Sequence, residues 1–180
     1  MDQLNMDVDV AFYGDSITYG GQWQQYFPDV QAVNLGYAGD GLSGMIDRIS
    51  QVYSVQPEKV FILAGINGLK ENGVAHSINY YEQIIEGIKC NLKNCNIYIQ
   101  SVLPISSSVE ERYGTNELIQ EYNEALMELA DRQSIEYVDL WSLYEINGQM
   151  NPEYTTDGVH LKAEAYNYWI KKIEPYVCDK

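Results

Sequence analysis

The chain has 180 residues, of which 46% are hydrophobic and 21% are charged, and its formal net charge is -15. This length buries one substantial core and is too short for two domains of usual size, so we predict a single domain over residues 1–180. No apolar run approaches the ~20 residues that cross a bilayer. The negative charge disfavours nucleic acid and anionic membrane surfaces as partners and favours a neutral or cationic ligand.

Residues 1–7 contain neither the basic nor the apolar segment of a signal peptide. We therefore expect a cytoplasmic protein, or a secreted or periplasmic one if a signal peptide was removed. The cysteines Cys90, Cys95 and Cys178 are odd in number and lack C-x-x-C spacing, which argues against a disulfide framework and a zinc site. We expect ordinary thiols, although Cys90 and Cys95 flank a predicted turn and could pair in an exported protein.

The apolar patterns predict strands near residues 8–13, 30–35, 60–64, 96–102 and 135–139. They predict helices near residues 22–27, 41–53, 74–92, 116–133 and 162–176. The connection through Gly148 and Pro152 is predicted to be long and irregular. Strands that alternate with helices favour a parallel sheet covered on both faces, which is a three-layer α/β/α sandwich.

The first predicted strand stops at Gly14 and is followed by Asp15, Ser16, Ile17 and Thr18. Glycine permits a sharp turn there. Ligands of open α/β sheets bind at the carboxyl ends of the strands, where the amides of a following helix favour negative charge. Ser16 is therefore a candidate nucleophile. Serine is also a common N-cap residue, and this stretch alone does not separate the two roles.

A serine nucleophile needs a base, and of the two histidines only His160 has a carboxylate at a short spacing. Asp157 precedes it by three residues in a turn that contains Gly158. This separation lets the carboxylate accept a proton from one ring nitrogen while the other nitrogen faces Ser16, as in a catalytic triad. Taken alone, the segment is better explained as a surface Asp-Gly turn with an incidental histidine.

Four sequence blocks in order resemble those of the SGNH (GDSL-like) hydrolase family, and the resemblance spans residues 8–176. The blocks are Gly14-Asp15-Ser16-Ile17-Thr18, the turn with Asn34, Gly36 and Gly39, Gly65-Ile66-Asn67, and Asp157-Gly158-Val159-His160-Leu161. The resemblance implies a five-stranded, flavodoxin-like α/β fold and the chemistry of small carbohydrate acetylesterases or lysophospholipase-like esterases. Many members carry Asp where this chain has Gly68, which leaves the loop geometry open but not the identity of the donor.

The resemblance also implies roles for individual residues. Ser16 would be the nucleophile, His160 the base and Asp157 the acid that orients it, with no metal and no cofactor. The oxyanion hole would consist of the backbone amides of Ser16 and Gly39 and the side-chain amide of Asn67. Glycine has no side chain to obstruct a carbonyl oxygen, and asparagine supplies a neutral donor, so these residue types suit the role.

The expected substrate is a small-molecule or glycan ester, and an O-acetylated carbohydrate is preferred because the chain has no insertion that could form an apolar lid. Expected substrate contacts are Asp15, Tyr37, Trp141 and Tyr154, and Tyr113 and Tyr144 are further loop aromatics that could line the pocket. The nearest alternative is a lysophospholipase or thioesterase that acts on longer acyl chains. A non-catalytic carbohydrate-binding module is a more remote alternative.

An NAD-binding oxidoreductase is suggested by Gly39-Asp40-Gly41-Leu42-Ser43-Gly44, which matches the pattern G-x-G-x-x-G. That fingerprint also requires an acidic residue at the end of the next strand, to hold the ribose. The next predicted strand ends in Ala64-Gly65 instead. The sequence therefore favours the esterase over the oxidoreductase.

Overall fold

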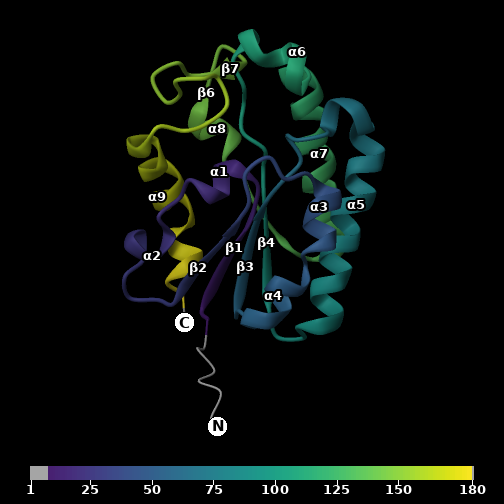
Figure 1. Ribbon diagram of the computed structural model, residues 1–180, viewed down its shortest axis with the longest axis vertical. Coiled ribbons are helices and arrows are strands. Elements are labelled where there is room, and N and C mark those ends of the chain that lie inside the picture. The colour runs from purple at the N-terminus through teal and green to yellow at the C-terminus, as the bar shows by residue number, and fades with distance from the viewer. Residues whose placement is uncertain (1–7, 180) are drawn as a thin grey trace.

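The computed structural model describes residues 8–179 and shows a parallel sheet between two layers of helices (Figure 1). Its strands are β1 (Val10–Gly14), β2 (Ala32–Gly36), β3 (Lys59–Leu63), β4 (Asn96–Gln100) and β5 (Glu136–Val138). Their order in the sheet is β2-β1-β3-β4-β5, which is the flavodoxin-like order. The predicted three-layer fold is confirmed. Residues 1–7, on which the expectation about a signal peptide was based, lie outside the described residues.

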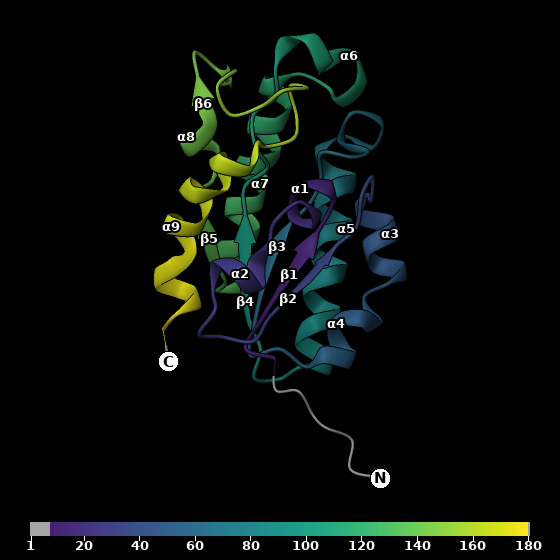
Figure 2. The same cartoon turned by 60° about the vertical axis from the view of Figure 1, so that its left-hand side comes forward.

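Two helices cover one face of the sheet, α2 (Trp23–Tyr26) and α9 (Tyr166–Val177), as Figures 1 and 2 show. The opposite layer contains α3 (Leu42–Asp47), α4 (Ser50–Val55), α5 (Leu69–Asn91) and α7 (Asn116–Gln133), and α7 packs against α5. The short helices α6 (Glu110–Tyr113) and α8 (Trp141–Tyr144) lie in the upper part of Figure 1, and α1 (Ser16–Tyr19) lies below them, at the upper end of the sheet. Within residues 8–179, no helix combines the length and apolar character needed to cross a membrane.

Aromatic side chains fill much of the core on both faces of the sheet. On the face covered by α2 and α9, Phe12 stacks on Trp23 at 4.0 Å, and Trp23 meets Trp169 edge-on at 4.9 Å. The indole Nε1 of Trp169 donates a hydrogen bond of 2.6 Å to the Gln100 side chain, which satisfies both buried groups. On the other face, the Tyr81 hydroxyl donates to the Ile62 carbonyl at 3.1 Å. Most of this aromatic content therefore serves packing.

Two predicted helices differ in detail from the structure. The single helix expected over residues 41–53 is two helices, because the backbone leaves helical geometry at Arg48, with φ -106° and ψ 12°. Helix α5 begins at Leu69, earlier than expected, and has a kink at Gly73, where φ is 71°. The kink lies next to the expected start at residue 74, so the periodicity located the regular part of this helix.

The expectation of an irregular connection after β5 is wrong in part. Residues on either side of an Asn-Gly pair form a hairpin of β6 (Glu145–Ile146) and β7 (Gln149–Met150). Asn147 and Gly148 both have positive φ values, 53° and 79°. Two-residue hairpin turns of type I′ require such values, and Asn-Gly is their strongest sequence signal.

Candidate active site

The first three loops of the expected site leave the sheet side by side. In the register of the parallel strands, Gly14 at the end of β1 is paired with Gly36 of β2 and with Leu63 of β3. The segments that carry Ser16, Gly39 and Asn67 follow these three strand ends. The sheet therefore brings them to one edge, as the sequence predicted.

Helix α1 is fixed over the end of β2 by contacts from distant segments. A Cβ atom at Gly36 would lie 2.2 Å from the backbone nitrogen of Tyr19, so only glycine allows this approach. The Asn34 side-chain amide donates to the Tyr19 carbonyl at 3.0 Å. From α9, the Tyr166 hydroxyl donates to the Ile17 carbonyl at 2.6 Å. These contacts hold the first turn of α1, and with it Ser16, in place.

Asp15 caps helix α1, and Ser16 is the first helical residue. The Asp15 carboxylate accepts a hydrogen bond of 2.9 Å from the backbone N–H of Ile17. The Ser16 hydroxyl is therefore not needed as a cap, and its Oγ lies 2.8 Å from Nε2 of His160, 144 positions away in the chain. The structure thus shows Ser16 paired with a histidine, whereas Asp15 acts as the helix cap.

His160 is held by the carboxylate of Asp157. Its Nδ1 lies 2.5 Å from Asp157 Oδ2, while Asp157 Oδ1 accepts from the backbone N–H groups of His160 at 2.8 Å and Val159 at 3.0 Å. Partial burial acts to raise the pKa of Asp157, but the hydrogen bonds from the His160 ring and these two amides outweigh it and hold the pKa below its usual range. The side chains of His160 and Asp157 are 45% and 51% exposed, so the site is open to solvent.

Sequence reasoning missed Thr155, which fixes the turn that carries this pair. Its buried hydroxyl donates to the His160 carbonyl at 2.7 Å and accepts from the Gly158 N–H at 2.9 Å. The Gly158 carbonyl accepts from the Ser106 N–H at 2.9 Å, which fastens the turn to the loop after β4. A threonine just before an Asp-Gly turn is a recognised local turn signal, and it could have identified this residue.

The two loop donors expected for the oxyanion hole belong to one hydrogen-bonded unit. The Asp40 N–H donates to the Tyr37 carbonyl at 3.2 Å and closes a turn in which Gly39 has φ 78°. The Asn67 side-chain amide donates to the Asp40 carbonyl at 2.9 Å. Because an asparagine amide has two N–H groups, this bond leaves a second one for a ligand. Apart from Gly39 and its two chain neighbours, no atom of residues 8–179 lies within 4 Å of the position that a Cβ would take at Gly39, so the turn is open there.

The departure from the family pattern at Gly68 has a local explanation. Gly68 has φ 92° and immediately precedes α5. A Cβ atom there would also lie 3.0 Å from the side-chain nitrogen of Asn72. An aspartate in this conformation would be strained, so glycine suits the loop that this chain forms.

Three residues expected to face a substrate are buried instead. Asp15 is fully buried, and one of its oxygens is used to cap α1, which corrects the expectation of a substrate contact. Tyr144 is fully buried, and its hydroxyl donates to the Ala165 carbonyl at 3.1 Å. Tyr113 is buried as well. Burial thus takes these side chains away from the surface that a substrate would contact.

The other three expected contacts differ in their surroundings. Tyr37 is 65% exposed and lies in the turn that contains Gly39. The ring of Tyr154 packs against that of Tyr168 at 5.0 Å and borders a surface hollow on α9. Trp141 lines a hollow over α7 and β5 together with Met127. Tyr37 lies in the turn that carries Gly39, and Tyr154 lies in the segment between β7 and α9 that also carries Asp157 and His160.

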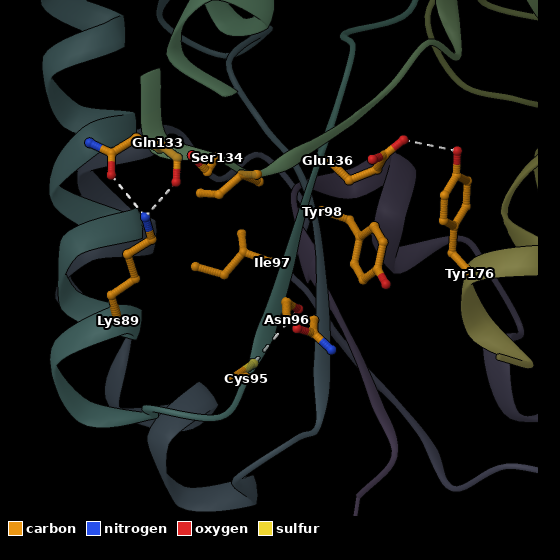
Figure 3. A pocket seen from close by; sticks show the side chains of 10 residues that line it. Lys89, Cys95, Asn96, Ile97, Tyr98, Gln133, Ser134, Glu136 and Tyr176 are labelled. Carbon is orange, nitrogen blue, oxygen red and sulfur yellow. Dashed lines mark hydrogen bonds between the residues drawn. The ribbon is translucent and has the colours of Figure 1, made fainter. Parts of the chain in front are cut away.

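A further hollow lies at the amino end of the sheet, the edge opposite Ser16 (Figure 3). Lys89 reaches into it and donates to the backbone carbonyl and to the side chain of Gln133, each at 2.9 Å. The Tyr176 hydroxyl donates to Glu136 at 3.1 Å. These polar groups satisfy one another, so we assign the hollow no role in the chemistry.

The cysteines and the acidic residues offer no metal centre in the part of the chain that the structure describes. Cys90, Cys95 and Cys178 are free thiols. Within residues 8–179, no three His, Cys, Asp or Glu side chains are grouped to hold a metal ion. That the reaction needs neither metal nor cofactor remains a prediction.

Comparison with known proteins gives matches over most of the chain. The family model described as GDSL-like Lipase/Acylhydrolase family matches residues 12–168. The GDSL esterase/lipase CPRD49 of Arabidopsis thaliana is 24% identical over an alignment 189 residues long, and the alignment covers 86% of this chain and 73% of that protein.

Solved structures share the fold. One is a Streptococcus pneumonia protein whose name refers to platelet activating factor, with 28% identity, a TM-score of 0.87 and coverage of 97% of this chain and 87% of that one. Another is a catalytic variant of Axe2, an acetylxylan esterase from Geobacillus stearothermophilus, with 15% identity, a TM-score of 0.75 and coverage of 98% of both chains. The family model spans the segments that carry Ser16, Asn67 and His160. The chain therefore belongs to the GDSL-like lipase/acylhydrolase family of hydrolases.

Proposed function

We propose that this chain is a serine esterase that hydrolyses carboxylic esters through an acyl-serine intermediate. The observation that carries the proposal is the continuous contact from Ser16 Oγ to His160 Nε2, at 2.8 Å, and from His160 Nδ1 to Asp157 Oδ2, at 2.5 Å. A ring that donates from Nδ1 to the carboxylate has Nε2 free to accept the serine proton. Geometry and tautomer both suit the removal of that proton.

The reaction would proceed in two halves. Ser16 Oγ attacks the carbonyl carbon of the ester while His160 accepts the hydroxyl proton. The amides of Ser16 and Gly39 and the second N–H of Asn67 stabilise the charge on the carbonyl oxygen. Collapse of this intermediate expels the alcohol, which takes the proton from His160. Water then attacks the acyl-serine while His160 accepts its proton, and His160 returns that proton to Ser16 Oγ as the acid leaves.

The proposed substrate is an O-acetyl group on a carbohydrate. With about half of the His160 and Asp157 side chains exposed, the site favours a small acyl group, because a long alkyl chain gains its affinity from apolar burial. The exposed ring of Tyr37 beside Gly39 offers an aromatic surface to a sugar. The net charge of -15 opposes approach to anionic lipid surfaces. Similarity in fold to the acetylxylan esterase Axe2 is in keeping with this choice.

A series of p-nitrophenyl esters from acetate to decanoate tests the size of the acyl group. We expect kcat/KM to be highest for acetate and to fall as the chain lengthens. Values that rise with chain length would favour a lysophospholipase or thioesterase. Acetate release from an acetylated xylooligosaccharide, compared with release from acetylated glycerol, tests the carbohydrate part.

The same series with Ser16→Ala tests the mechanism. We expect this variant to fold and to lose turnover on every ester, by a factor on the order of 10⁴ or more. Sugar binding without ester turnover by the unmodified protein would instead indicate a carbohydrate-binding module.

A further inference from the structure

Arg48 connects three segments at the edge of the sheet where Ser16 lies. Its Nε donates to Asp40 Oδ2 at 2.6 Å, and its two terminal nitrogens donate to the carbonyls of Leu35 at 2.8 Å and Gly14 at 2.9 Å. Leu35 lies near the end of β2 and Gly14 at the end of β1, two residues before Ser16. The Arg48 and Asp40 side chains are 15% and 10% exposed, so this pair is largely shielded from water.

Asp40 in turn supports both loop donors of the proposed oxyanion hole. It directly follows Gly39, and its N–H closes the turn in which Gly39 lies. Its carbonyl accepts the hydrogen bond from the Asn67 side chain at 2.9 Å. A shift of Asp40 would therefore move the Gly39 amide and release the Asn67 amide together.

The local sequence makes room for this arrangement. A Cβ atom at Gly44 would lie 2.0 Å from Asp40 Oδ1, so a side chain there would displace the carboxylate. A Cβ atom at Gly41 would lie 3.0 Å from the Asn67 carbonyl. These glycines of the G-x-G-x-x-G pattern thus allow close packing around Asp40. Arg48 follows the last residue of α3, and its guanidinium lies over the ring of Tyr13, 4.6 Å from the ring centroid.

We propose that Arg48 and Asp40 are positioning residues that hold the Gly39 and Asn67 donors in place for the oxyanion of the ester reaction. This inference rests on the proposed function. Arg48 donates to Asp40, Leu35 and Gly14 from three different nitrogens of its guanidinium, a spread that the single nitrogen of a lysine ammonium cannot reproduce. Removal of this geometry would weaken stabilisation of the transition state and leave substrate binding largely unchanged.

A double-mutant cycle tests the proposal with Arg48→Lys, Asn67→Ala and the double variant, on p-nitrophenyl acetate. We expect Arg48→Lys to lower kcat by about tenfold to a hundredfold, as expected for displaced catalytic groups, with KM nearly unchanged. In the Asn67→Ala background the same change should lower kcat much less, because one of the donors that Arg48 positions is already absent. Unfolding free energies, measured in parallel, should show no matching coupling.

Arg132→Lys is the matched control, because Arg132 forms a more exposed ion pair with Glu82 at 3.6 Å. We expect it to leave kcat unchanged. If Arg48→Lys fails to fold, Asp40→Asn removes the ion pair at nearly constant volume and replaces it in the cycle. A loss of kcat that is the same in both backgrounds, or no loss, would overturn the positioning role.

The cycle also separates this inference from the proposed function. If Ser16→Ala and Asn67→Ala both lose activity while Arg48→Lys keeps it, only the positioning role fails. If Asn67→Ala is fully active, the assignment of Asn67 fails and the positioning role fails with it. Full activity of Ser16→Ala would refute the serine mechanism itself.

Discussion

Asp15 caps helix α1 through the backbone N–H of Ile17, at 2.9 Å, and this contact leaves the neighbouring Ser16 hydroxyl to His160. Serine and aspartate are both good N-cap residues, so either could have taken the position. Because Asp15 takes it, Ser16 begins the helix with its Oγ facing the imidazole. The cap at Asp15 thus leaves the Ser16 hydroxyl available to His160.

Asp15 should make stability depend on pH. It is fully buried, and one of its oxygens has no hydrogen-bond partner among residues 8–179. Burial raises its pKa from 3.8 to about 7, although the hydrogen bond from Ile17 and the charges of His160 and Arg48 oppose the shift. The carboxyl group is therefore more easily protonated in the folded state. Its contribution to stability is complete below pH 3.8 and is lost as the pH rises to about 7.

Urea unfolding of the unmodified protein and of Asp15→Asn between pH 4 and pH 8 measures this effect. We expect the unmodified protein to lose stability relative to the variant across that interval. Curves that stay parallel would show that the carboxyl group does not change its protonation there.

Asp157→Asn should lower kcat by between about 10² and 10⁴, because the amide no longer accepts the Nδ1 proton and favours the wrong tautomer of His160. Its stability effect has the opposite sign to that of Asp15. The folded pKa of Asp157 is lowered, so its contribution is present above the unfolded pKa of 3.8 and fades as the pH falls below it. Steady-state kinetics and unfolding at pH 7 and pH 3 check both statements. Full activity in the variant would contradict the assigned role.

Thr155→Val should destabilise the turn that carries His160. The substitution removes the hydroxyl that donates to the His160 carbonyl and accepts from Gly158, and it leaves the buried Gly158 N–H without this partner. We expect a loss of about 1–3 kcal/mol in the free energy of unfolding, together with a lower kcat. Thr155→Ser keeps the hydroxyl and should stay close to the unmodified protein in both measurements. Equal behaviour of the two variants would mean that the hydroxyl has no such role.

Gly36→Ala should displace helix α1 from the end of β2, because the added Cβ would lie 2.2 Å from the backbone nitrogen of Tyr19. We expect a loss of at least about 1–3 kcal/mol in stability, as for an overpacked core. Since Ser16 begins this helix, activity should fall in the protein that remains folded. Thermal unfolding and kinetics of the purified variant measure both. An unchanged melting temperature would show that the helix can move at little cost.

The sequence predicted those features that depend on residues close together in the chain. Apolar runs located the five strands, and the three-residue spacing of Asp157 and His160 allowed the contact that the structure shows at 2.5 Å. The Asn147-Gly148 hairpin was also predictable, since both residues adopt the positive φ values that this pair favours. The apolar patterns alone do not contain this signal.

The remaining features depend on contacts between distant residues. The helix breaks at Arg48, whose side chain donates to the carbonyls of Leu35 and Gly14, and helical periodicity contains no information on such long-range contacts. The burial of Asp15 and of Tyr144 depends on elements that pack over them from elsewhere in the chain. A residue next to a candidate nucleophile was therefore expected in the pocket, whereas the fold places it underneath.

Covalent labelling of Ser16 tests the central claim most directly. A fluorophosphonate reacts with a serine whose hydroxyl is activated, so intact-mass spectrometry of the treated protein should show one adduct, which peptide mapping should place on Ser16. Ser16→Ala should take up none, and His160→Ala should be labelled far more slowly. A label on another residue, or equal labelling of the His160 variant, would contradict a serine activated by this histidine.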